Sequence, residues 1–122
     1  MSSLVVKSME KMPKVFILFP IGSLDGNTYE LLEKKAEYLI SEGDASIINI
    51  DMKDVDFISS MGVRAVIKIK KSLALKGGKM VMSNLQPQIK KVFEIINALP
   101  SLTIFASIEE LDEYLAVMQR NA

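Results

Sequence analysis

Residues 48–63 read INIDMKDVDFISSMGV, and the character of the chain changes twice within them. Two isoleucines, one on either side of Asn49, come first, an acidic stretch follows, and two serines and a glycine then open a helical pattern. A short apolar run is typical of a buried strand, and a serine at the start of a helical pattern is typical of a helix cap. The stretch therefore predicts a strand, a loop and a helix start. It leaves open whether the serines do more than begin the helix.

Outward from this stretch, predicted strands and helices alternate along the chain. The predicted strands are residues 3–9, 14–20, 45–51, 79–83 and 102–105. The predicted helices begin near Asn27, Ser60, Pro87 and Ser107. Asn27 and Ser107 each have a glutamate three residues on, as in a capping box. The first two strands form a hairpin, and the alternation after them implies a mostly parallel sheet. We expect a single α/β domain over residues 1–122, with a five-stranded mixed sheet and four helices.

Composition excludes several classes of function. The 122 residues contain no cysteine and no histidine, which excludes disulfides, thiolate or imidazole metal sites and catalytic triads with an imidazole base. Fifteen basic residues balance fifteen acidic ones, so we expect no nucleic-acid partner. The longest apolar run, 15–21, is too short to span a bilayer, and the first residues do not form a signal peptide. A cytoplasmic protein with no membrane insertion and no cofactor is expected.

Three carboxylates follow the predicted strand 45–51. Asp51, Asp54 and Asp56 stand where open α/β sheets place their ligands, and carboxylates are ligands that Mg²⁺ prefers. A small Mg²⁺-dependent phosphoryl-transfer enzyme is therefore an alternative. A phosphate-receiver domain would also need an acidic pair after its first strand and a lysine after its last, and neither is in place. We expect a solvated loop with no metal and no catalytic residue.

Three patterns in order resemble the STAS domain family of anti-sigma factor antagonists, also called anti-anti-sigma factors. They are GSLDGNT at 22–28, INIDMKDVDFISSMGV at 48–63, and the segment 76–111, which begins KGGKMVMSNLQP. Together they cover about residues 14–115. The resemblance implies a sheet with four helices packed mainly on one side. It also implies a regulatory switch that is not an enzyme.

The resemblance assigns a role to one of the two serines. In the family, the phosphorylated serine stands two places before the signature glycine, which here is Gly62, so the acceptor position falls on Ser60. The implied partner is an anti-sigma factor that is also a serine kinase of the GHKL type. The unphosphorylated form binds this partner and the phosphorylated form releases it, which controls sigma-factor-dependent transcription.

The residues around Ser60 can be interpreted as neighbours of a phosphorylation site or as ordinary cap and turn residues. Ser59 is interpreted as a helix cap, and Asp25 lies in the loop that borders the acceptor in the family fold. The family more often has aspartate before the acceptor and serine or threonine after it, where this chain has Ser59 and Met61. The alternative within the fold is a STAS scaffold or transport-accessory subunit that is never phosphorylated.

A basic stripe begins beside Ser60. Arg64, Lys68 and Lys71 recur at helical spacing opposite the apolar side of the predicted helix, and Met61 lies close to them. Such stripes are usually solvated surface, but methionine adapts well to protein interfaces. We interpret Met61, Arg64, Lys68 and Lys71 as partner-binding residues of a monomer or weak dimer.

Overall fold

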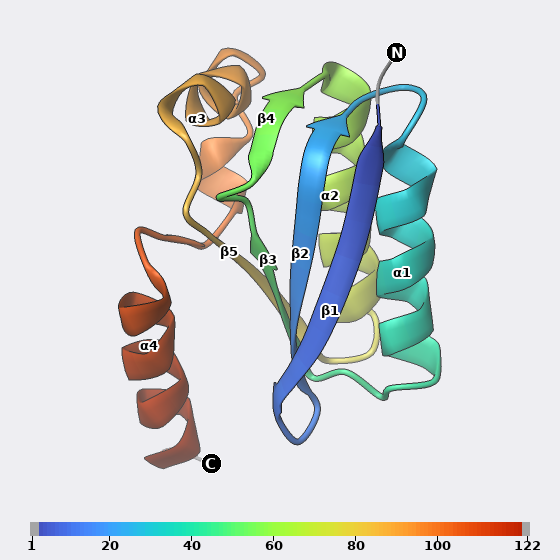
Figure 1. The fold of residues 1–122 in the computed structure, drawn as a ribbon. Coiled ribbons are helices and arrows are strands. Elements are labelled where there is room, and N and C mark those ends of the chain that lie inside the picture. The colour runs from blue at the N-terminus through green and yellow to red at the C-terminus, as the bar shows by residue number, and fades with distance from the viewer. Residues whose placement is uncertain (1–2, 121–122) are drawn as a thin grey trace.

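The computed structural model describes residues 3–120 and has a mixed sheet flanked by helices (Figure 1). Its strands are β1 (Leu4–Met12), β2 (Val15–Leu24), β3 (Ile47–Asp51), β4 (Val55–Ile58), β5 (Lys79–Ser83) and β6 (Ile104–Phe105). Its helices are α1 (Tyr29–Ser41), α2 (Ser60–Ala74), α3 (Pro87–Ile95), the 3₁₀ turn η1 (Leu99–Ser101) and α4 (Ile108–Arg120). The predicted alternation of strands and helices, the hairpin and the α/β class are confirmed.

The sheet runs in the order β1, β2, β3, β5, β6, and only β1 is antiparallel to its neighbour. The sequence predicted five strands, and the described residues contain six, because β4 lies within the stretch interpreted as an acidic loop. Strands β3 and β4 lie end to end along β2. The first pairs with Val15–Leu18 and the second with Gly22–Leu24. The carboxyl ends of β2 and β4 therefore meet at one edge, which is where α1 and α2 begin.

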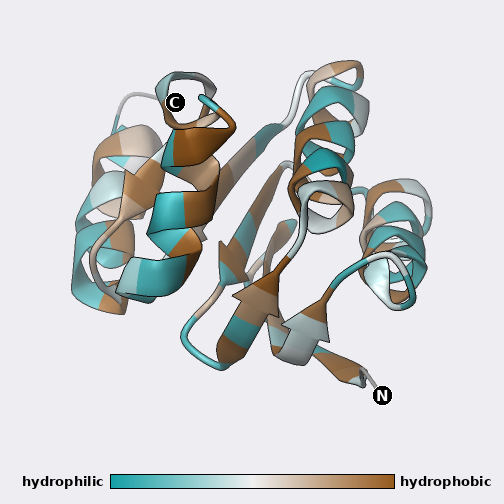
Figure 2. Ribbon diagram, turned by 90° about the horizontal axis from the view of Figure 1, so that it is seen from above, coloured by the Kyte–Doolittle hydropathy of each residue, from teal (hydrophilic) through white to brown (hydrophobic). Residues whose placement is uncertain are grey.

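Helices cover both faces of the sheet (Figure 2). Phe16 and Leu18 of β2 face a core that includes buried residues of α1, α2 and α3, whereas Val15 and Ile17 face the opposite way, toward α4. This alternation is what a strand with both faces buried produces. The expected packing of helices mainly on one side is confirmed, since three of the four α-helices contribute to the larger core.

The two predicted capping boxes differ in outcome. Ser107 does cap α4, because its Oγ accepts a hydrogen bond from the Glu110 N–H at 3.3 Å. The box at Asn27 is wrong: α1 begins one residue later, with Thr28 at the cap position. The Asn27 N–H is already bonded to Asp25 Oδ1 at 2.9 Å, so Asn27 belongs to a turn stabilised by the aspartate.

Candidate functional site

The two serines occupy different positions at the start of α2. Ser59 has an extended backbone and is the N-cap, and its Oγ accepts a hydrogen bond from the Gly62 N–H at 3.3 Å. This confirms the interpretation of Ser59 as a cap. Ser60 is the first helical residue, and it is exposed. A group attached to its hydroxyl would stand in solvent at the positive end of the 15-residue helix α2.

Leu24, the last residue of β2, holds the start of α2 in place. The Ser59 N–H donates to the Leu24 carbonyl oxygen at 3.0 Å. Gly62 lies so close that a Cβ atom built on it would be 2.5 Å from that same oxygen. The signature glycine is therefore needed for close approach of two backbones, which makes it a positioning element for Ser60.

The loop between β2 and α1 is fixed by its own side chains. The Thr28 hydroxyl donates to the Ser23 carbonyl oxygen at 2.7 Å and accepts from the Asp25 N–H at 3.0 Å. The Asp25 carboxylate accepts from the Asn27 N–H and is half-buried. Asp25 thus sits in an ordered loop that contacts the start of α2 through Leu24. Whether its charge acts on a phosphate at Ser60 stays a prediction.

The basic stripe lies on the outward side of α2, and α1 contributes to the same surface. Arg64, Lys68 and Lys71 are exposed, and the Arg64 guanidinium lies 3.9 Å from the Met61 sulfur. A hollow of about 280 Å³ begins at Met61. It is lined by Tyr29, Glu33, Met61, Arg64, Ala65 and Lys68.

Two lining residues of this hollow were not singled out from the sequence. Tyr29 and Glu33 stand four residues apart on α1, a spacing that places them on one face of the helix. Glu33 forms an ion pair with Lys68 across the two helices, with 3.4 Å between Oε1 and Nζ. The spacing alone predicts a shared face, but the pairing of α1 with α2 is a tertiary fact.

The three carboxylates of the enzyme alternative do not form a site. Asp51 is 1% exposed, which corrects the expectation of a solvated loop. Its Oδ1 accepts from the Lys53 N–H at 3.1 Å and from the Asn84 amide at 3.2 Å. Asp56 is exposed on β4 and accepts from the Ser23 hydroxyl. Within residues 3–120 no group of three or more acidic side chains could hold a metal ion.

The chain belongs to the STAS domain family, whose model matches residues 7–111. Its type within that family follows from a curated relative, BtrV of Bordetella bronchiseptica, which is named as an anti-sigma factor antagonist. The two are 30% identical over 88 residues, which are 72% of this chain and 75% of the relative. The chain is therefore a STAS domain of the anti-sigma factor antagonist type.

Solved structures share the fold. The anti-sigma factor antagonist SpoIIAA in its unphosphorylated form aligns with a TM-score of 0.78 and 20% identity, covering 92% of this chain and 97% of that one. The phosphorylated form of SpoIIAA from Bacillus aligns with a TM-score of 0.70 and 21% identity, covering 90% of this chain and 99% of that one. A sulfate transporter family protein from Wolinella succinogenes aligns with a TM-score of 0.77 and 16% identity, covering 92% of this chain and 93% of that one. At these identities the likeness concerns the fold alone. Among the described residues, no helix is both long and apolar enough to cross a bilayer.

Proposed function

We propose that this protein is a phosphorylation-controlled switch that binds an anti-sigma factor when Ser60 is free and releases it when Ser60 is phosphorylated. The observation that carries the proposal is the exposed Ser60 at the first helical position of α2, beside a hollow lined by Met61, Arg64 and Lys68. The neighbouring Ser59 is half-buried and its Oγ accepts the capping bond, whereas Ser60 is exposed, which supports Ser60 as the acceptor.

The electrostatics of α2 determine whether a phosphoryl group on Ser60 would affect the fold of the domain or its binding to the partner. A phosphoserine carries about −1.5 to −2 charges and is stabilised at a helix N-terminus. The fold would therefore tolerate phosphorylation of Ser60. In the complex, the same phosphoryl group would be removed from water and would have no opposite charge on the partner, which makes the binding free energy less favourable by several kcal/mol. Binding is lost while the domain stays folded.

The partner in this proposal is an anti-sigma factor with serine-kinase activity of the GHKL type, and its release controls sigma-factor-dependent transcription. Met61, Arg64, Lys68 and Lys71 provide the docking surface, with Tyr29 and Glu33 of α1 at its border. A docking role requires no catalysis by this chain. The proposal therefore includes a cytoplasmic, non-catalytic single domain over residues 1–122.

The test uses three tagged forms of the full chain as bait in extracts of the source cells. Wild type and Ser60→Ala should retain a kinase-fold protein, identified by mass spectrometry, and Ser60→Asp should bind it at least tenfold more weakly, about 1.4 kcal/mol. Ser60→Asp should also melt no lower than wild type, because an acidic group at a helix N-terminus is favourable. Phosphate on the 57–64 peptide of wild type should map to Ser60.

A second function within the same fold is supported by Ser59 and Met61, which depart from the residues that the family more often has beside its acceptor serine. If Ser60→Asp retains every partner that wild type retains, and neither serine becomes phosphorylated, the protein is an unswitched STAS scaffold or transport-accessory subunit. Phosphate found on Ser59 alone would show that the acceptor lies one residue earlier than Gly62 implies.

A further inference from the structure

Strand β1 forms one edge of the sheet. It spans nine residues, Leu4–Met12, and within the described chain it pairs only with β2. A long edge strand presents unpaired backbone N–H and C=O groups and is a template for another strand. Its sequence, LVVKSMEKM, has no proline to block such pairing.

The direction of these free backbone groups follows from the ladder. The Ser23 N–H donates to the Ser3 carbonyl oxygen at 3.0 Å, whereas the Gly22 N–H donates away from β1, to Asp54. Because hydrogen-bonded and non-hydrogen-bonded pairs alternate in an antiparallel ladder, alternate residues of β1 direct their backbone groups to the open side. These residues are Leu4, Val6, Ser8 and Glu10.

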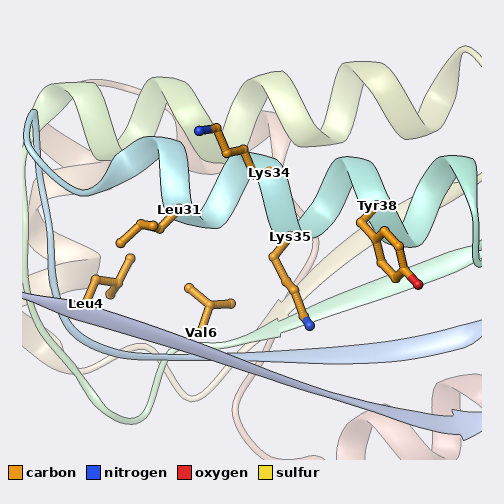
Figure 3. A pocket seen from close by; sticks show the side chains of 6 residues that line it. All are labelled: Leu4, Val6, Leu31, Lys34, Lys35 and Tyr38. Atoms are coloured by element: carbon orange, nitrogen blue, oxygen red, sulfur yellow. The ribbon is translucent and has the colours of Figure 1, made fainter.

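A hollow of about 560 Å³ runs beside this edge, between β1 and α1 (Figure 3). Leu4 and Val6 form one side of it, and four residues of α1 form the other: Leu31, Lys34, Lys35 and Tyr38. Leu31 is 50% exposed and Tyr38 is 60% exposed. Seven residues apart, they form one apolar stripe on the flank of α1. The open edge thus carries backbone donors and acceptors together with an apolar, basic groove.

We propose that the occupant of this edge is a second copy of the same chain, paired antiparallel through β1 about a twofold axis at Ser8. In this register the regular part of the strand, residues 6–10, pairs with the same residues of the second copy. The residues that meet across the axis, Ser8 with Ser8 and Val6 with Glu10, are those whose backbone groups face outward. Pairing of this kind gives affinity through the main chain and specificity through side chains in an adjacent groove.

The charges select the same register. A twofold axis perpendicular to the sheet leaves every side chain on the same face of the sheet, and opposed residues in an antiparallel pair also share a face. The axis must therefore pass between two copies of one residue, and not between two neighbouring residues. Centring the pair on Lys7 would place Lys7 opposite Lys7, and centring it on Met9 would place Lys7 opposite Lys11. Like charges directly opposite one another are destabilising. Centring on Ser8 places Lys7 opposite Met9 and avoids both conflicts.

The groove adds complementary contacts to this register. Glu10 of the second copy would stand opposite Val6, next to the two lysines that line the hollow. Glu10 Oε2 accepts a bond from the Lys14 N–H at 3.1 Å, and the other carboxylate oxygen remains to accept from Lys35. In Figure 3 the Lys35 side chain extends toward β1, and Tyr38 lies at the end of the hollow away from Leu4. The twofold axis would therefore bring the two Tyr38 rings close together. No lining residue belongs to α2, so Ser60 stays accessible in such a dimer.

The register can be tested by cysteine pairing, because the chain has no cysteine of its own. Opposed residues in an antiparallel pair have Cα atoms about 4.5–5.5 Å apart, within the range that a disulfide bridges. Ser8→Cys should form a disulfide-linked dimer under mild oxidation. Lys7→Cys and Met9→Cys, matched controls on the same strand, should form much less. Equal cross-linking of the three, or preference for either control, would overturn the proposed register.

The contacts can be tested by sedimentation of the wild-type protein and variants over a range of concentrations. Tyr38→Glu, Lys35→Glu and Glu10→Lys should each weaken dimerisation at least tenfold, and Lys35→Glu combined with Glu10→Lys should recover most of the loss. Phe57→Glu, which changes an aromatic residue that is 53% exposed outside the groove, should have no effect. Circular dichroism would verify that each variant is folded. A wild-type chain that stays monomeric at every concentration contradicts the proposal, as does a dimer that dissociates only with Phe57→Glu.

Discussion

At the scale of single residues, Ser59 and Ser60 differ in what each contributes to the fold. Ser59→Ala removes the oxygen that accepts from the Gly62 N–H and should lower the free energy of unfolding by about 1 kcal/mol. Ser60→Ala changes an exposed side chain and should stay within about 0.5 kcal/mol of wild type. Urea denaturation of the two variants measures both values. An equal loss for both would mean that the capping bond is not what distinguishes them.

The sequence could predict the cap at Ser59 because capping is local: one hydroxyl and an N–H three residues on are enough. It could not predict the cap of α1 in the same way. Asn27 has the right side chain and spacing, but its N–H is held by Asp25, and Thr28 takes the cap position instead. Where two short polar side chains compete for the same turn, their relative geometry decides the outcome, and the residue types alone do not.

At the scale of elements, the contact between α2 and the end of β2 depends on Gly62. Alanine is the better helix former by about 1 kcal/mol, which alone would make Gly62→Ala stabilising. However, its Cβ would lie 2.5 Å from the Leu24 carbonyl oxygen, and overpacking of this kind costs about 1–3 kcal/mol. Because the obstructing atom belongs to the backbone and cannot rotate away, we expect a net loss of stability on urea denaturation.

Gly26→Ala is the matched control, since a Cβ there meets nothing within 4 Å. It should be neutral or stabilising by up to about 1 kcal/mol, because alanine restricts the unfolded chain. If Gly62→Ala instead gained stability as Gly26→Ala does, α2 could move away from β2 at little cost, and Gly62 would not position Ser60.

Element boundaries were predictable where the apolar pattern is continuous, as in β3 and β5, which are buried almost throughout. Strand β4 was missed because only its two ends are buried, with exposed Asp56 and Phe57 between them. Such a pattern has neither the alternation of a half-buried strand nor the run of a buried one. Its pairing with β2 extends the ladder already made by β3, and this depends on tertiary structure.

At the scale of the whole molecule, the sequence predicted which segments alternate but not which distant residues meet. The position of Ser60 relative to Gly62 was readable from the chain. The contribution of Tyr29 and Glu33 to the surface beside it requires α1 to pack against α2. The face on which α4 packs is likewise set by a core that joins residues about 100 positions apart, with Val15 and Leu111 among its members. Local periodicity contains no information about such pairs.

The two cores, one on each face of the sheet, separate stability from the proposed switch. Leu111 of α4 is fully buried in the smaller core, across the sheet from α2. Leu111→Ala should lower the free energy of unfolding by about 2–5 kcal/mol, measured by urea denaturation. Calorimetric titration with the anti-sigma factor, at a temperature where the variant is fully folded, should give the wild-type affinity. Val66→Ala removes buried volume beneath α2 itself and should lower both stability and affinity. If Leu111→Ala reduced the affinity as much as Val66→Ala, the two faces of the sheet would be energetically coupled, and α4 would act on the switch rather than only completing the fold.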